Sequence, residues 1–290
     1  MIIDLHIHSK TCSDGNLTVK EIIKEAKTRK INLISITDHD SIDCQNIAMN
    51  LTKKIQICYI YGIELNISFS HPNFYNGKAA SLDLLGYQFD INNKQLQKKL
   101  EQLSQYRKER AKKILEKLNT EFKKEGLISF TKEDLKEIQN STDGALGRPH
   151  IADYMIRKEI VTDRKEAFEK YLLKCNIPKY PLYLEEASNM LRNAGAIVVL
   201  AHPNDPYGTS LTKLCNSLQE QTKIIKESML PYIDGIECWH SRNTAETTKH
   251  YTNFSKKHKL IMTGGSDCHQ NPIIMGTVLV PDFVTKQFLK

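Results

Sequence analysis

The chain has 290 residues, of which 40% are hydrophobic and 26% are charged. These proportions are typical of a globular protein and exclude a disordered chain. No apolar run is long enough to cross a membrane, so we expect no membrane partner. The formal net charge of +7 fits an anionic substrate and equally a solvated surface. The sequence begins without the pattern of a signal peptide, and we expect a cytoplasmic protein.

Strands and helices alternate at the beginning of the chain. Thr18-Val19-Lys20-Glu21 has the pattern of a capping box, which begins a helix. The alternation indicates a parallel sheet with helices outside it. The predicted strands cover 2–8, 33–37 and 57–63, and the predicted helices cover 18–29 and 42–54.

The same alternation returns near the end of the chain, with a different region in between. Residues 93–180 are predicted to be helical, beginning with a long Lys-, Glu- and Gln-rich periodic segment. We therefore predict an α/β fold in which residues 1–92 and 181–290 build one barrel or sheet and residues 93–180 form an α-helical insertion. The later predicted strands cover 197–201, 233–237 and 260–263, and the later helices cover 184–193, 211–227 and 244–258.

The seven cysteines are dispersed, odd in number and free of any C-x-x-C pair. We expect them to be mostly buried, small hydrophobic residues of a protein in a reducing compartment. Cys12, Cys44 and Cys268 lie close to the polar motifs described next. Their surroundings do not favour a role as metal ligands.

Histidine and carboxylate residues gather where the predicted strands end. In Asp4-Leu5-His6-Ile7-His8 the two histidines alternate on a strand, so both imidazoles face the same side. Parallel strands end at one edge, which is where barrel enzymes build their sites. Imidazole and carboxylate together suit Zn, Mn or Fe. The other clusters are Ser13-Asp14-Gly15, Thr37-Asp38-His39-Asp40, Gly62-Ile63-Glu64, Ala201-His202-Pro203 and Gly265-Ser266-Asp267-Cys268-His269.

Taken together, these motifs resemble those of the PHP (polymerase and histidinol phosphatase) superfamily. They occur in the family's order and span nearly the whole chain. The resemblance implies a distorted (β/α)7 barrel with two or three divalent metal ions as cofactors. In this resemblance His6, His8, Glu64 and Asp267 hold one ion, and Glu64 bridges to a second ion that His202 helps to hold. A third ion is held by Asp14, His39 and His269.

One position departs from the family's pattern. Relatives carry a histidine on the strand after the glutamate, where this chain has Asp83-Leu84-Leu85-Gly86. We predict that Asp83 ligates the second ion through oxygen, which favours a harder ion such as Mn or Mg at that position. His71 is a rival ligand, although Pro72-Asn73 after it indicates a loop. The remaining alternative is a weak or missing second ion.

The insertion carries the predicted substrate-binding residues. Arg107 and Arg110 lie three apart on one helix, and Arg148 and His150 open another. Such arginines are ordinarily a solvated surface, but an arginine fork also suits a phosphate. The layout resembles PHP proteins that remove phosphate from nucleotides, in which a helical insert caps the barrel. We therefore predict that Arg110, Arg148 and His150 bind the substrate, with Lys179 as a weaker candidate.

The resemblance implies a metal-dependent phosphatase that acts on nucleotides, chiefly nucleoside 3′,5′-bisphosphates or AMP, through metal-activated hydroxide. No side chain beyond the metal ligands is assigned a catalytic role. The expected partner is a small phosphorylated substrate, with short RNA as a further one, and no obligate protein partner is indicated. The alternatives are a 5′–3′ exonuclease on short RNA, a histidinol-phosphate phosphatase, and a module that binds metal or nucleic acid without catalysis.

Overall fold

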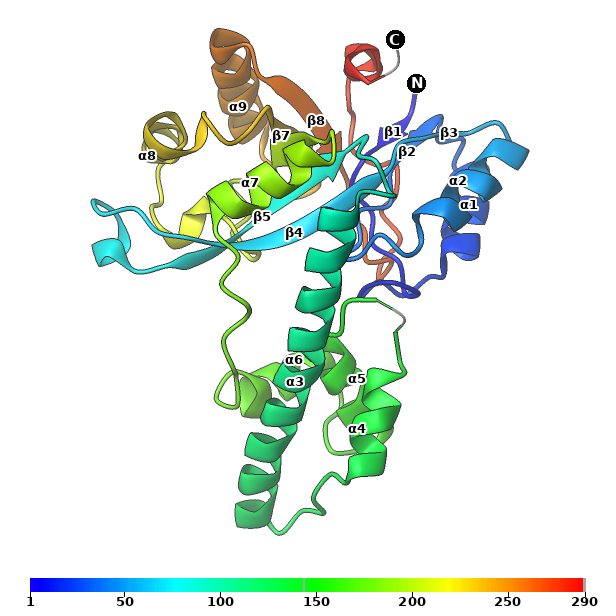
Figure 1. Ribbon diagram of the computed structural model, residues 1–290, viewed down its shortest axis with the longest axis vertical. Coiled ribbons are helices and arrows are strands. Elements are labelled where there is room, and N and C mark those ends of the chain that lie inside the picture. Colours follow the sequence, from blue (N-terminus) through cyan, green and yellow to red (C-terminus); the bar gives the residue numbers. More distant parts are fainter. Residues whose placement is uncertain (143, 289–290) are drawn as a thin grey trace.

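The computed structural model describes residues 1–142 and 144–288, which form a mixed α/β fold (Figure 1). The α/β class predicted from the sequence is therefore confirmed. The strands are β1 (Ile3–Asp4), β2 (Leu33–Ile34), β3 (Cys58–Tyr59), β4 (Gly62–Phe69), β5 (Ala80–Tyr87), β6 (Ile197–Leu200), β7 (Gly235–His240) and β8 (Ile261–Gly265).

Longer helices surround the sheets or extend from them, and shorter helical turns connect them. No helix within the described residues has both the length and the apolar character needed to cross a membrane. The α-helices are α1 (Val19–Thr28), α2 (Gln45–Lys54), α3 (Lys94–Glu125), α4 (Lys132–Gln139), α5 (Arg148–Arg157), α6 (Arg164–Ala167), α7 (Leu184–Asn193), α8 (Leu218–Ile224) and α9 (Ala245–His258). The 3₁₀ segments are η1 (Tyr75–Gly77), η3 (Leu211–Lys213) and η5 (Asp282–Gln287), and the π segments are η2 (Phe168–Leu172) and η4 (Ile225–Met229).

The strands form two sheets, in the orders β1-β2-β3 and β4-β5-β6-β7-β8. The predicted parallel arrangement is correct for the first sheet and for β6, β7 and β8. It is wrong for β5, which is antiparallel to both β4 and β6. β5 is antiparallel to β4 because the link between Phe69 and Ala80 is shorter than the crossover that neighbouring parallel strands need. The predicted strand 57–63 is accordingly divided between β3 and β4.

The two sheets approach each other at both edges. The Leu5 amide donates to the Gly264 carbonyl over 3.2 Å, which brings β8 against β1, and His39 forms an isolated bridge with Glu64. Within residues 1–142 and 144–288 these contacts do not complete a closed barrel. They are sufficient to bring the ends of β1, β2, β4 and β8 to one place.

Several predicted helix ends are confirmed by their caps. The Thr18 hydroxyl accepts from the Glu21 amide, and the Glu21 carboxylate accepts from the Thr18 amide over 2.8 Å, which completes the capping box of α1. Thr244 caps α9 by accepting from the Thr247 amide. The predicted helix 211–227 is wrong as a single element, because Ser217 caps a new helix, α8, after η3.

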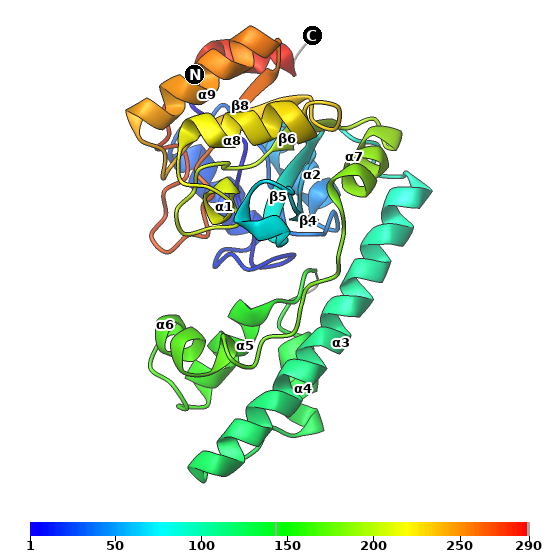
Figure 2. The same cartoon turned by 90° about the vertical axis from the view of Figure 1, so that its left-hand side faces the viewer.

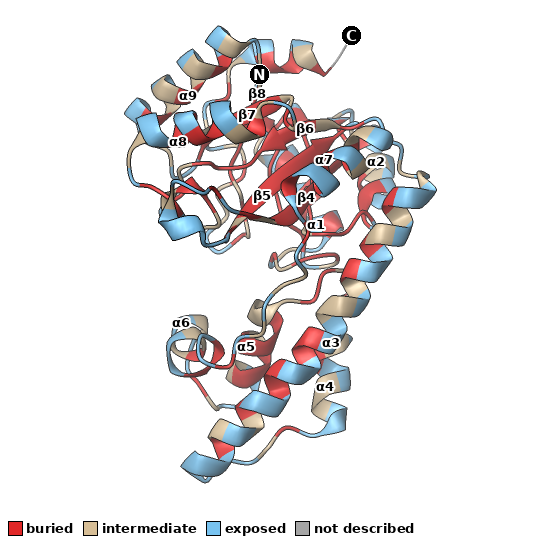
Figure 3. Ribbon diagram, turned by 60° about the vertical axis from the view of Figure 1, so that its left-hand side comes forward, coloured by how far each residue is buried: buried red, intermediate tan, exposed pale blue. Residues whose placement is uncertain are grey.

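The helical segment between β5 and α7 has a hydrophobic core of its own. Figures 1 and 2 show α3 running away from the sheets, with α4, α5 and α6 beside its far half. Ile114, Leu118 and Phe122 on α3 pack against Ile151 and Tyr171. Figure 3 shows this buried stripe on α3 next to an exposed opposite face. A separate core explains how a segment of this size can fold beside the sheets.

The structure also contains a disulfide that the sequence did not predict. Cys12 and Cys44 are bonded and buried, and they connect the segment after β1 with the start of α2. The expectation that cysteines are buried holds for Cys175, Cys215, Cys238 and Cys268, whereas Cys58 is exposed. Cys12 and Cys44, which lie near the polar motifs, thus cross-link the two segments that carry those motifs.

Thiol counting tests this cross-link directly. In denaturant without reductant, five of the seven cysteines are expected to react with a thiol reagent, because five are free in the structure. After reduction all seven should react. A C44S variant should show six reactive thiols under both conditions. Seven reactive thiols in the unreduced wild-type protein would contradict the disulfide.

Candidate metal centre

The candidate centre is organised around Glu64, which β4 places between four imidazoles. Its Oε1 lies 2.9 Å from His202 Nε2 and 3.3 Å from His6 Nε2. Its Oε2 lies 2.9 Å from His39 Nδ1 and 3.3 Å from His8 Nε2. Glu64 is 1% exposed, so these charges meet where water does not screen them. The sequence placed Glu64 just after a strand, but it lies inside β4.

The nine predicted ligands come together from both ends of the chain, two of them from strands and the others from the segments that follow strands. Asp267 Oδ1 lies 3.2 Å from His8 Nε2 and 3.5 Å from His6 Nε2. On the other side of His8, Asp14 Oδ1 lies 3.3 Å from His269 Nε2. Among the nine predicted ligands, four groups have ligand atoms within 4.8 Å of one another: His6–His8–Asp267, His6–Glu64–His202, His39–Glu64–Asp83 and His8–Asp14–His39–His269. A fifth such group, Cys12–Asp38–Cys44, includes the two disulfide-bonded cysteines.

Unsatisfied buried atoms indicate that these residues fit metal ions. In the described residues, the buried ring nitrogens His6 Nε2, His8 Nε2 and His39 Nδ1 and the Glu64 oxygen Oε2 have no hydrogen-bond partner. His39 Nδ1 is close to Glu64 Oε2, but the pair does not have hydrogen-bond geometry. Each such buried atom costs about 1–3 kcal/mol when nothing satisfies it. Imidazole and carboxylate atoms that converge in this way suit cations, and their mixture suits Zn, Mn or Fe.

The backbone is strained at two of these residues. Asp267 has φ 53° and His202 has φ 23°, a region that residues with side chains rarely adopt. Such strain is concentrated at functional sites, where the surroundings enforce it. Gly265 allows a close contact between two segments, because a Cβ there would lie 2.4 Å from the backbone nitrogen of His6. Only glycine therefore lets β8 approach the strand that carries His6 this closely.

Two further aspartates of the motifs fix the loops. Asp38 accepts from the Ser9 amide over 2.6 Å and from the Ser9 hydroxyl over 2.7 Å. Asp4 accepts from the amide and hydroxyl of Ser266 and from the Gly276 amide. Burial raises the pKa of Asp38 to about 6. Both carboxylates are engaged by the backbone, so they position the ligand loops.

Asp83, which stands where the family has histidine, reaches the centre but is already engaged. Asn66 donates to its Oδ1 over 2.7 Å, and the Thr209 hydroxyl donates to its Oδ2. The same Oδ2 lies 3.9 Å from His202 Nε2. The rival ligand His71 takes part in none of the four groups and lies 3.4 Å from Glu227. Asp83 therefore remains the candidate ligand on this side.

Sequence reasoning assigned no role to two residues of β7, Glu237 and His240. Glu237 accepts from His6 Nδ1 over 3.0 Å and from the His202 amide over 2.8 Å, so it orients two ligands. A carboxylate behind a ligating imidazole fixes its ring and raises its basicity. The buried His240 has its Nε2 3.5 Å from Asp267 Oδ2. A signal was available for His240, because it is the last residue of a strand that pairs in parallel with its neighbours.

A hollow of about 310 Å³ opens onto the centre. Its wall includes six of the nine predicted ligands together with Lys179 and Arg242, whose guanidinium donates to Asp205 over 2.5 Å. Lys179 also lines the narrow space occupied by Arg107 and Arg110. Cations therefore lie next to the metal ligands, as an anionic substrate would require.

The three residues predicted to bind substrate lie outside that wall. Arg110 is buried and donates to the Ile177 carbonyl over 2.7 Å. Arg148 lies over the ring of Phe168 at 5.1 Å. His150 Nδ1 accepts from the Gly147 amide, and its Nε2 lies 3.0 Å from the Ser13 carbonyl. His150 thereby links α5 to the segment that carries Asp14. The assignment of these three residues stays a prediction.

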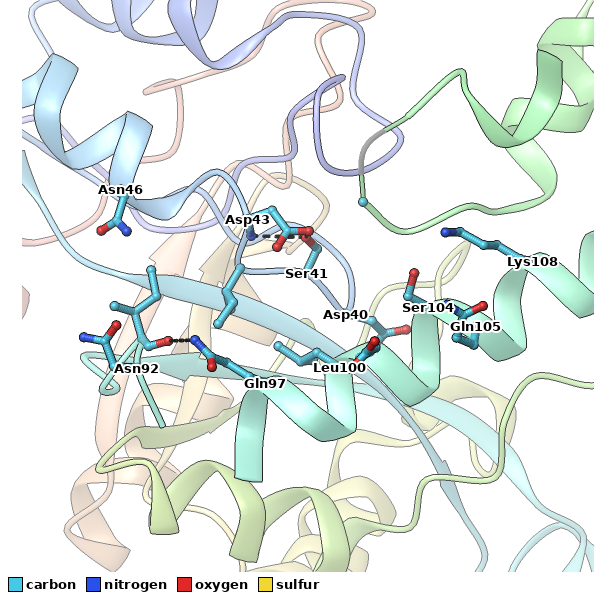
Figure 4. A pocket seen from close by; sticks show the side chains of 14 residues that line it. Asp40, Ser41, Asp43, Asn46, Asn92, Gln97, Leu100, Ser104, Gln105 and Lys108 are labelled. Carbon is cyan, nitrogen blue, oxygen red and sulfur yellow. Dashed lines mark hydrogen bonds between the residues drawn. The ribbon is translucent and has the colours of Figure 1, made fainter. Parts of the chain in front are cut away.

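A second hollow, of about 550 Å³, lies between α3 and the loop after β2 (Figure 4). Asp40, Asp43, Gln97 and Lys108 are among the residues that line it, and none of the nine predicted ligands does. Asp40 is also paired with Arg107 of α3. This hollow therefore belongs to the contact between α3 and the sheets, and the contact places the helical segment beside the centre.

The charges of the centre depend on one another. Burial alone would lower the pKa of His8, but the carboxylates of Asp267 and Glu64 outweigh it and raise this pKa to about 10. In the same way burial disfavours a charged His202, and Glu64 raises its pKa to about 9. Burial would raise the pKa of Glu64, but His39 and His6 hold it well below its usual range. At neutral pH, protons on the imidazoles therefore balance the carboxylates of the ion-free protein.

Comparison with known proteins decides the family. The family model of the PHP domain matches residues 4–251. The chain belongs to the PHP family.

Two curated relatives and one solved structure are similar to this PHP chain over nearly its whole length. A 3′,5′-nucleoside bisphosphate phosphatase from Chromobacterium violaceum is 25% identical, with 92% of this chain and 87% of that protein covered. The 5′-3′ exoribonuclease Rnm of Escherichia coli is 24% identical, with coverages of 93% and 86%. A structure from Bifidobacterium adolescentis, assigned as a metal-dependent phosphoesterase, has a TM-score of 0.80 at 25% identity and coverages of 99% and 95%. These matches confirm the prediction of a metal-dependent phosphoester hydrolase.

Metal binding to this PHP chain is expected to release protons. His8 and His202 have pKa values of about 10 and about 9, above the ordinary 6.5, so they are protonated in the ion-free protein at neutral pH. A bound ion must displace these protons, so affinity for Mn should increase as the pH rises from 6 to 9. Calorimetric titrations in two buffers of different ionisation enthalpy measure the proton count. Binding with no net proton release would contradict this electrostatic account.

Proposed function

We propose that the chain is a phosphatase for nucleotides that hydrolyses phosphate monoesters, chiefly nucleoside 3′,5′-bisphosphates or AMP. The observation that carries the proposal is the convergence of nine ligand-type side chains beside a hollow that Lys179 and Arg242 also line. The bisphosphate phosphatase relative, similar over most of both chains, supports the choice of substrate.

The proposal distributes three ions over the nine predicted ligands. His6, His8, Glu64 and Asp267 would hold one ion, Glu64, His202 and Asp83 a second, and Asp14, His39 and His269 a third. The donors suit Mn, Fe or Zn. When bound, such ions would lower the pKa of a water molecule and neutralise charge on the phosphoryl oxygens. The same proposal treats the two sheets as arcs of one distorted barrel, which the hydrogen bond between Leu5 and Gly264 supports.

The chemistry is the hydrolysis of an ester bond to phosphorus. A water oxygen forms a bond to phosphorus, the bond between phosphorus and the ester oxygen breaks, and that oxygen takes a proton as inorganic phosphate is released. Arg242 and Lys179 would bind phosphate oxygens, because both line the hollow. Glu237 would hold His6 in a fixed orientation throughout.

The helical segment 93–180 is proposed to be the substrate cap. His150 links α5 to the Ser13 carbonyl, and Arg107 pairs with Asp40 after the His39 ligand. Lys179, at the end of the segment, reaches the hollow itself. The cap would thus provide both rigid attachment to the ligand loops and positive charge for a second phosphate.

A second candidate is 5′–3′ hydrolysis of short RNA in the same site. The exoribonuclease relative supports it, as does a larger hollow that continues from the centre along α9. A nucleoside 3′,5′-bisphosphate has the same groups as the phosphorylated 5′ end of an RNA. The two activities therefore need the same ligands and differ in what lies beyond the phosphate that is attacked.

Phosphate release by metal-stripped protein resupplied with Mn tests the first candidate. Release from adenosine 3′,5′-bisphosphate should be faster than from AMP or an aryl phosphate, because only the bisphosphate offers a second phosphate to the cations. H6A, D14A and D267A should each reduce turnover at least about 100-fold, since each removes a ligand. H71A is the matched control and should retain turnover, because His71 pairs with Glu227. No release from any of the three substrates would refute the proposal.

A further inference from the structure

Lys179 lies in the wall of the hollow at the metal ligands, at the end of the helical segment 93–180. Within the described residues its side chain forms no ion pair, whereas Arg242, the arginine of the same wall, is paired with Asp205. A lysine ammonium group without a carboxylate partner therefore borders the space in which the substrate phosphate is proposed to bind.

The surroundings of Lys179 weaken its hold on its proton. Burial lowers the pKa of its ammonium group, because the charged form is poorly solvated there. The nearby carboxylates of Asp83 and Asp40 oppose this shift, but Asp40 is already paired with Arg107. The guanidinium groups of Arg107 and Arg110, which line the adjoining narrow space with Lys179, lower the pKa further. An ammonium group with a lowered pKa transfers its proton more readily than an ordinary lysine does.

The proposed hydrolysis needs a proton donor that the metal ligands do not supply. A ribose oxygen leaves as a strongly basic alkoxide unless a proton reaches it as its bond to phosphorus breaks. An imidazole or carboxylate that holds an ion must be deprotonated, so it has no proton to give. The guanidinium of Arg242 keeps its protons at any ordinary pH. A lysine, in contrast, can bind the oxygen and also transfer a proton to it.

Two hydroxyl groups also line the hollow, but their surroundings favour them less than Lys179 as proton donors. The Thr209 hydroxyl already donates to Asp83. Tyr207 is 83% exposed, so water surrounds most of its side chain. Among the described residues of the wall, Lys179 is therefore the proton donor that is both half-buried and without another hydrogen-bond partner.

We propose that Lys179 is the general acid of the reaction and protonates the ester oxygen that leaves. The inference rests on the proposed phosphatase function and deepens it, since it assigns the source of the proton. As the bond between phosphorus and the ester oxygen breaks, its electron pair passes to that oxygen. The oxygen forms a bond to a proton of the ammonium group, and the electron pair of the broken N–H bond stays on nitrogen. A proton from water then restores the ammonium group for the next turnover.

The test compares two leaving groups in the Mn-loaded protein. Adenosine 3′,5′-bisphosphate releases a strongly basic ribose oxygen, whereas 4-nitrophenyl phosphate releases a weakly basic phenolate that needs no acid. The variant K179R keeps the positive charge but does not give up a proton at neutral pH. It should lower kcat for the bisphosphate at least about 100-fold and leave kcat for the aryl phosphate within about threefold of the wild type.

Two controls separate proton transfer from binding and from structure. Y207F removes the exposed hydroxyl group of the same wall and should retain kcat for both substrates within about threefold. The Mn content of K179R after desalting should equal that of the wild type, because Lys179 belongs to none of the groups of ligand atoms.

Three results would overturn the inference while the proposed function stands. They are wild-type turnover of the bisphosphate by K179R, an equal loss on both substrates, and a loss of Mn from K179R. The first would show that a positive charge is sufficient, and the other two would assign Lys179 to binding or to the metal centre. If the wild type releases phosphate from neither substrate, the proposed function is refuted and the inference with it.

Discussion

The rest of the site depends on one carboxylate surrounded by imidazoles. Glu64 lies within 3.3 Å of nitrogens from His6, His8, His39 and His202, and all five side chains come from different parts of the fold or from alternate positions of one segment. Such a cluster is costly without compensation, because buried charges and unsatisfied nitrogens destabilise a folded chain. Bound cations would remove that cost. The positive φ of two ligands and the close approach that Gly265 allows both serve this convergence.

Much of the site could be predicted from the sequence, because its residues carry local signals. His6 and His8 alternate on the predicted strand 2–8, and Asp267 and His269 follow another predicted strand, so each pair was expected to face one side. In the structure β1 is limited to Ile3–Asp4, and both histidines lie just after it. The capping box at Thr18 likewise fixed where α1 begins. These predictions needed only neighbours in the chain. The comparisons with known proteins then established the family that the motifs resembled.

What could not be predicted depends on contacts between distant segments. The antiparallel direction of β5 depends on how it pairs with β4 across a short link, and the disulfide joins Cys12 to a residue 32 positions away. The hydrogen bond of the buried Arg110 to the Ile177 carbonyl is one such contact, and the prediction that Arg110 binds the substrate stays untested. Charge and spacing on a helix do not reveal which face another segment will cover. Lys179 was predicted only as a weaker candidate, and yet this single lysine in a connecting segment lines the hollow at the metal centre.

The most direct test of the metal centre is the number of ions that each chain retains. Protein loaded with Mn and freed of excess ion by desalting is analysed for metal content beside an E64A variant. The arrangement around Glu64 predicts two to three ions per chain in the wild type. In the variant the content should fall by at least one ion, because Glu64 reaches the imidazoles of several groups. Less than one ion in the wild type, or an unchanged content in E64A, would contradict the account.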